Sequence, residues 1–110
     1  MISTSDAPNG GKIIVRVDPD LEDLVPGFLE NRQKDIQSVL EALTRNDYAA
    51  IAKIGHTMKG VGGGYGFDAI TDIGRSVEQA AKDKSPAKIK ASLDALSDYL
   101  RRIEIVFDPD

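Results

Sequence analysis

Residues 46–67, NDYAAIAKIGHTMKGVGGGYGF, carry the pattern that indicates the fold. Asn46 or Asp47 is placed to cap a helix, because a short polar side chain accepts a hydrogen bond from the first free backbone N–H groups. Apolar residues then follow at spacings of three and four, which puts them along one side of a helix. They are Tyr48, Ile51, Ile54, Met58 and Val61. We expect this helix to continue until the run of glycines at positions 62–64 weakens it.

The chain on both sides of this segment shows further helical patterns. Upstream, a cap residue and a proline at positions 18–19 predict a short helix, which Pro26 ends or kinks. A longer helix follows and should end near Arg45. Downstream, Asp68 is predicted to cap one helix, and Ser85 with Pro86 is predicted to open another. The apolar stripes of these three long helices are Phe28, Leu29, Ile36, Val39, Leu40 and Leu43; Ile70, Ile73, Val77, Ala80 and Ala81; and Ile89, Leu93, Leu96, Leu100 and Ile103.

Four long amphipathic helices joined by short polar turns bury their apolar sides most simply in an all-α, antiparallel four-helix bundle, with the short first helix as a lid. We predict a flexible tail over residues 1–11 and one bundle domain over residues 12–110, since 110 residues suit a single core. Two β-branched segments, residues 12–17 and 103–107, are possible extended segments at the termini. The second of them either pairs with the first or continues the last helix, and we favour the continuation.

Composition excludes several classes of function. The chain has 18 acidic and 14 basic residues and a formal charge of −4, which disfavours nucleic acid as a partner. It has no cysteine and one histidine, so disulfides, thiolate nucleophiles and multi-histidine metal sites are excluded. No apolar run approaches the roughly 18 residues of a membrane span. We therefore expect a cytoplasmic protein that does not enter a membrane and binds no metal.

The residues from Gly55 to Phe67 hold six glycines, although each interior glycine costs a helix about 0.5–1 kcal/mol. At about 100° per residue, His56, Gly60 and Gly63 fall opposite the apolar stripe, and Lys59 lies on the same flank. This pattern predicts an exposed imidazole with a cation beside it. The bare backbone at Gly60 and Gly63 would let the surface of another protein come close, which makes both glycines candidate docking positions.

An exposed imidazole is a nucleophile at neutral pH, because the free side chain titrates near pH 6.5. A phosphoryl group is a suitable electrophile, since Lys59 can compensate the charge of its oxygens. The sequence holds neither a GxxxxGK[ST] loop nor a GxGxxG loop, so the phosphate donor should be another protein with its own metal. The alternative is that His56 and Lys59 are ordinary surface residues and that the glycines mark a frayed helix end. Glu78 and Gln79 are expected to face solvent.

His56-x-x-Lys59-Gly60, followed by Gly66, resembles the signature of histidine-containing phosphotransfer (HPt) domains, the intermediates of two-component phosphorelays. The likeness covers about residues 18–107 and implies a four-helix bundle. It also implies that His56 is the phosphoacceptor through the ring nitrogen distal to the backbone, that Lys59 assists the phosphoryl group and that Gly60 leaves room for a receiver domain. The glycines at positions 62–64 depart from the family, which commonly has small polar residues there.

The resemblance implies a stoichiometric relay without ATP-dependent kinase activity. A response-regulator receiver domain or a hybrid histidine kinase would be the partner, with Mg²⁺ bound by the receiver and no cofactor on this chain. We expect a monomer. Two alternatives remain: a helical adaptor that binds a receiver or kinase without accepting phosphate, and a kinase dimerisation domain, which would require an obligate dimer.

Overall fold

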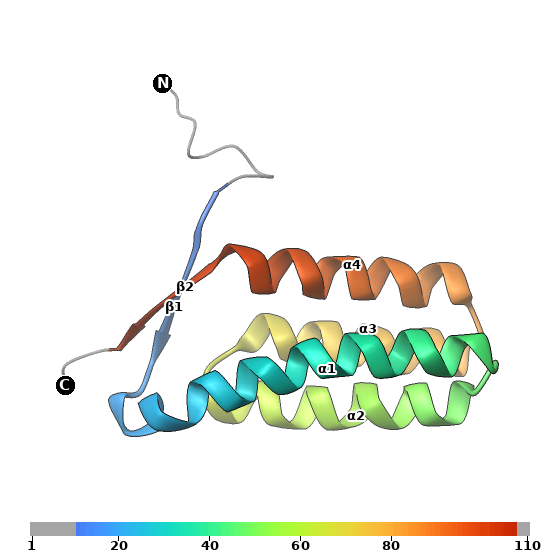
Figure 1. Ribbon diagram of the computed structural model, residues 1–110, viewed down its shortest axis with the longest axis horizontal. Helices are drawn as coiled ribbons and strands as arrows, with labels where there is room; N and C mark the ends of the chain where they lie inside the picture. The colour runs from blue at the N-terminus through green and yellow to red at the C-terminus, as the bar shows by residue number, and fades with distance from the viewer. Residues whose placement is uncertain (1–10, 108–110) are drawn as a thin grey trace.

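The computed structural model describes residues 11–107 and is mostly helical (Figure 1). In chain order its elements are β1 (Ile13–Val17), the 3-10 helix η2 (Pro19–Leu24), α1 (Val25–Thr44), α2 (Tyr48–Tyr65), α3 (Asp68–Lys82), α4 (Pro86–Arg102) and β2 (Ile103–Phe107). The four long helices lie side by side, and the chain reverses direction at each turn between them (Figure 1). The predicted set of four long helices is confirmed.

Two of the four long helices begin at a side-chain cap. Asp47 caps α2 by accepting a hydrogen bond from the backbone N–H of Ala50 at 3.1 Å, and Ser85 caps α4 through Lys88 N at 3.3 Å. The prediction that Asp68 caps α3 is wrong, because Asp68 is the first residue of the helix and Phe67 stands before it. The carboxylate of Asp68 still lies in the first turn, where the helix dipole favours negative charge.

Proline and glycine mark two boundaries of the long helices. The short helix before Pro26 forms as η2 and gives way to α1 at Val25, so that Pro26 occupies the first turn, where its missing N–H is tolerated. That η2 acts as a lid stays a prediction. Helix α2 continues through the glycines at 62–64 and ends at Tyr65, and Gly66 caps it with a φ of 88° that few other residues adopt. The helix thus ends directly after the glycine run and not within it, and the expected weakening stays a prediction.

Strands β1 and β2 pair in parallel, from Ile13 opposite Ile103 to Val17 opposite Phe107. The favoured continuation of the last helix through residues 103–107 is therefore wrong, and the alternative of paired strands is confirmed. Arg102 is the last residue of α4, and it stabilises the transition from α4 to β2. Its Nε donates a hydrogen bond of 2.7 Å to the carbonyl of Gly11. Gly11 is buried, and residues 1–10 of the predicted tail lie outside the described residues, as do 108–110.

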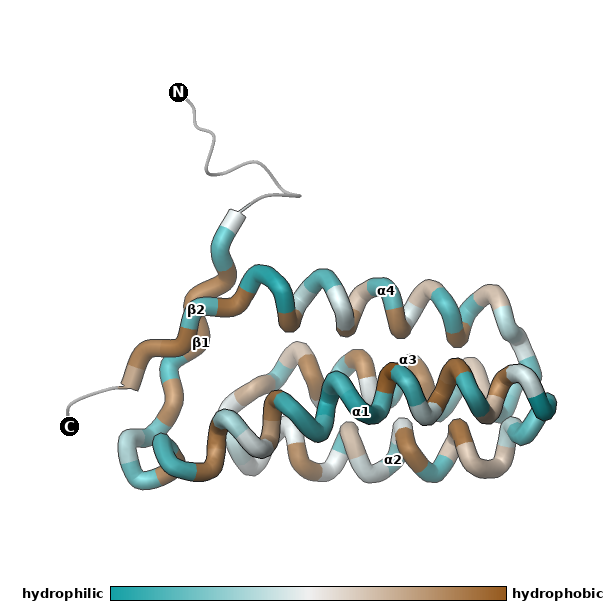
Figure 2. Tube along the Cα trace, in the orientation of Figure 1, coloured by the Kyte–Doolittle hydropathy of each residue, from teal (hydrophilic) through white to brown (hydrophobic). Residues whose placement is uncertain are grey.

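Hydrophobic (brown) segments recur along every helix and both strands, separated by hydrophilic (teal) ones (Figure 2). The largest of the fully buried side chains in the core are Val17, Val39, Ile51, Met58, Phe67, Ile70, Val77, Ile89 and Leu96. At one end Phe28 stacks on Tyr65 and Phe67, with ring centroids 4.3 and 5.0 Å apart. Buried Arg32 lies 4.7 Å from the centroid of the Phe28 ring and is paired with Asp35 at 2.8 Å.

Helices α2 and α3 approach each other closely at buried glycines. A Cβ added to Gly74 would lie 2.4 Å from the backbone N of Lys59, and one added to Gly55 would lie 2.6 Å from the backbone N of Glu78. Backbone atoms stand where side chains usually separate two helices. This contact fixes which α3 residues can reach the exposed side of α2.

Candidate functional site

His56 lies on the exposed side of α2. Its side chain is 69% exposed, whereas Ile51 and Met58 on the same helix are fully buried. The predicted placement of the imidazole opposite the apolar stripe is therefore confirmed. Because the rest of α2 is held by its buried side and by the glycine contacts with α3, the imidazole stands on a rigid support.

Glu78 of α3 lies beside the imidazole. Its oxygen Oε2 is 3.3 Å from Nδ1 of His56, and its other oxygen, Oε1, accepts a 3.0 Å hydrogen bond from Nζ of Lys59. Only 15% of the Glu78 side chain is exposed, so the expectation that it faces solvent is wrong. Gly74 is one helical turn earlier on the same face of α3, and the close approach of the helices there directs Glu78 across α2.

The Glu78 carboxylate is surrounded by positive charge. The hydrogen bond from Lys59 lowers the pKa of the Glu78 carboxyl, the charges of Lys59, Lys82 and His56 lower it further, and partial desolvation opposes them. Glu78 is therefore charged at neutral pH. A fixed negative charge next to Nδ1 favours a proton on that nitrogen and leaves the lone pair on the distal nitrogen Nε2.

Lowering the pH is expected to remove the stability that Glu78 contributes. Because folding lowers the pKa of its carboxyl, the contribution is fully present above about pH 5 and is lost as the pH falls below the ordinary value of 4.5. Urea unfolding of the wild type and of Glu78→Gln, at about pH 7 and about pH 3.5, measures the loss. The free-energy difference between the two proteins should shrink at the acidic pH, and an unchanged difference would contradict this assignment.

Lys59 lies one turn after His56, as predicted, but it is not a free surface lysine. Its side chain is 33% exposed, and its ammonium group binds Glu78. Its backbone carbonyl also accepts a 3.2 Å hydrogen bond from Oγ1 of Thr71 on α3. The ammonium is thus held within reach of the imidazole by a carboxylate that contacts both side chains.

The glycines after the histidine differ in their surroundings. A Cβ on Gly60 or Gly64 would meet no atom within 4 Å, so the backbone there is open on its outer side. Gly63 is exposed too, but its Cβ would stand 3.6 Å from Oγ1 of Thr71. Gly62 is buried against α3. Open backbone therefore follows His56 for about two turns, with Gly60 at its centre and Gly63 at its edge.

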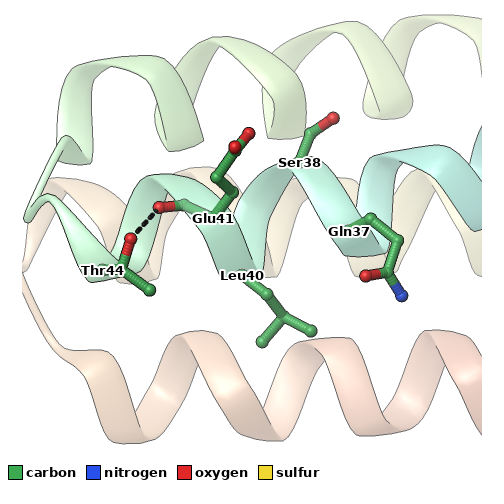
Figure 3. A pocket seen from close by; sticks show the side chains of 5 residues that line it. All are labelled: Gln37, Ser38, Leu40, Glu41 and Thr44. Carbon is green, nitrogen blue, oxygen red and sulfur yellow. Dashed lines mark hydrogen bonds between the residues drawn. The ribbon is translucent and has the colours of Figure 1, made fainter.

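Other surface features lie apart from this cluster. A shallow depression on α1 is lined by Gln37, Ser38, Leu40, Glu41 and Thr44, with a hydrogen bond from Thr44 to the Glu41 carbonyl (Figure 3). It contains no imidazole or cation. Within residues 11–107 no three His, Cys, Asp or Glu side chains are grouped as metal ligands. No described helix is long and apolar enough to cross a membrane.

Comparison with known protein families agrees with this geometry. The family model described as Hpt domain matches residues 23–105, which include His56, Lys59 and Glu78. The chain belongs to the Hpt domain family. Membership implies histidine phosphotransfer in two-component signalling, with receiver domains and kinases as partners. No curated protein and no solved structure matches this Hpt domain.

Sequence reasoning missed Glu78 and Lys82, which come from α3. The available signal was Gly74, a glycine inside the predicted fourth helix, just as Gly55 lies inside the third. Paired glycines on two neighbouring helices indicate a close crossing, and Glu78 follows Gly74 by four residues. The cluster around Glu78 thus brings together an imidazole, a carboxylate and two ammonium groups from two helices.

Proposed function

We propose that this Hpt domain is a phosphorelay intermediate, which accepts a phosphoryl group from a response-regulator aspartate onto His56 and passes it to another receiver domain. The observation that carries the proposal is the contact between Nδ1 of His56 and the Glu78 carboxylate, with the ring otherwise exposed. This contact engages Nδ1 and leaves Nε2, the nitrogen distal to the backbone, available to a docking partner.

In the transfer, the Nε2 lone pair forms a bond to phosphorus while the bond from phosphorus to the aspartate oxygen breaks. The electron pair of that bond stays on the aspartate, which becomes a carboxylate again. Positive charge develops on the imidazole as Nε2 bonds to phosphorus, and the Glu78 carboxylate next to Nδ1 stabilises it. The reaction needs in-line positioning and charge compensation more than covalent assistance.

Lys59 and Gly60 act where the chain meets the phosphoryl group and the receiver. The Lys59 ammonium, 3.0 Å from Glu78, is close enough to turn toward the phosphoryl oxygens. Gly60 and, at the edge, Gly63 allow the receiver surface to approach the backbone of α2. The Mg²⁺ ion belongs to the receiver in this proposal, and the chain acts as a cytoplasmic monomer with a receiver or a hybrid histidine kinase as its partner.

Incubation of the purified chain with several phosphorylated receiver domains and Mg²⁺ tests the proposal, with intact mass as the readout. We expect one added phosphate that is stable in base and labile in acid, as a phosphoramidate is. A receiver that binds near His56 without transferring its phosphate would instead support the adaptor function. An obligate dimer in size-exclusion chromatography would contradict the monomeric relay.

A further inference from the structure

Lys82 is a second cation of the site that the His56 motif does not include. It lies in the last turn of α3, four residues after Glu78 and therefore on the same face of the helix. Its Nζ is 3.6 Å from Oε2 of Glu78, the oxygen that lies 3.3 Å from Nδ1 of His56. Lys59 occupies the other oxygen, Oε1. The carboxylate thus holds one ammonium group at each oxygen.

The two ammonium groups are placed for different tasks when His56 carries a phosphoryl group. With a neutral imidazole, Glu78, Lys59 and Lys82 sum to a charge of +1. A phosphoryl group brings about −1.5 to −2. If Lys59 turns to the phosphoryl oxygens, Glu78 loses its only hydrogen bond from a lysine while a second anion arrives beside it. A mostly buried carboxylate without a cation next to a phosphoryl group is strongly disfavoured.

We propose that Lys82 is a positioning residue, which keeps Glu78 charged and in contact with Nδ1 of His56 while Lys59 moves to the phosphoryl group. This inference rests on the proposed relay function. Lys82 does not contact the reacting atoms, because its partner is Oε2 on the Nδ1 side of the ring. Its 61% exposed side chain can follow small movements of the carboxylate without leaving it. In each transfer cycle Lys59 therefore leaves the Glu78 carboxylate and returns to it, while Lys82 stays beside it.

The first test removes Lys59 and asks whether Lys82 holds Glu78 without it. His56 is the sole histidine of the chain, so the ¹⁵N signals of its ring report the Nδ1 contact directly. In the unphosphorylated Lys59→Ala protein these signals should stay close to those of the wild type. In Lys59→Ala/Lys82→Ala they should move to the values of Glu78→Ala. Signals that are the same with and without Lys82 in the Lys59→Ala background would overturn the proposal.

The second test measures transfer from a phosphorylated receiver at saturating receiver concentration. Lys82→Ala should lower the transfer rate constant about fivefold, the effect of one partly screened ion pair, and Lys82→Arg should restore it to within about twofold. Lys88→Ala is the matched control, because Lys88 is an exposed lysine whose ion-pair partner is Asp83 and not Glu78. Equal transfer rate constants for Lys82→Ala and Lys88→Ala would overturn the proposed role of Lys82 but would leave the relay function standing. A wild type that accepts no phosphate would overturn the relay itself and this inference with it.

Discussion

Replacing Gly74 by alanine is expected to lower the free energy of unfolding by about 2–3 kcal/mol, the cost of overpacking a tight contact. The added Cβ would stand 2.4 Å from the backbone N of Lys59 and 2.8 Å from the carbonyl O of Gly55. Both are backbone atoms of a helix, so no side-chain rotation can relieve the overlap. Helices α2 and α3 must separate, which exposes apolar surface at their contact.

Urea unfolding followed by circular dichroism measures this effect. Gly64→Ala is the matched control, since Gly64 is also a helical glycine but has open space where its Cβ would be. Alanine there should raise the free energy of unfolding by roughly 0.5–1 kcal/mol through helix propensity alone. If both substitutions changed the free energy of unfolding in the same direction, the close approach of α2 and α3 at Gly74 would be contradicted.

His56→Gln is expected to abolish phosphorylation while leaving receiver binding within about threefold of the wild type. Glutamine is of similar size and polarity, but its amide nitrogen is not a nucleophile. The imidazole is 69% exposed and accounts for little of the packing of α2, so the fold should remain. The loss concerns the reaction, because no other histidine is present to accept the phosphate.

The measurement is intact mass after incubation with a phosphorylated receiver, together with calorimetric binding to the unphosphorylated receiver. Lys53→Ala is a suitable control, because Lys53 is an exposed residue of α2 about one turn before the histidine. It should accept phosphate as the wild type does. An acid-labile phosphate on His56→Gln would show that another residue is the acceptor.

The four long helices are predictable because each is specified locally. Asp47 and Ser85 cap α2 and α4, and one-sided apolar stripes follow. The segment from Ile103 to Phe107 is different, since its alternation of apolar residues suits a strand and its Ile103 also continues the stripe of α4. The choice depends on Gly11 and on strand β1, about 90 residues away in sequence, which no local pattern reveals.

The candidate site, like the fold, is predictable from the sequence only in part. His56, Lys59 and Gly60 share one helix, so a helical wheel places them together. Glu78 and Lys82 come from α3, and their distance from His56 depends on how deeply α2 and α3 pack at Gly74. A periodic pattern gives the direction of a side chain around its own helix, but it does not give the distance between two helices.

Nuclear magnetic resonance of the phosphorylated protein, labelled with ¹⁵N in its single histidine, tests the central claim most directly. The ¹⁵N–³¹P coupling identifies the ring nitrogen that carries the phosphoryl group. Because the Glu78 carboxylate lies 3.3 Å from Nδ1, the coupling should appear at Nε2 of His56 and at no other nitrogen. Coupling at Nδ1, or a phosphate without coupling to the histidine, would contradict the account.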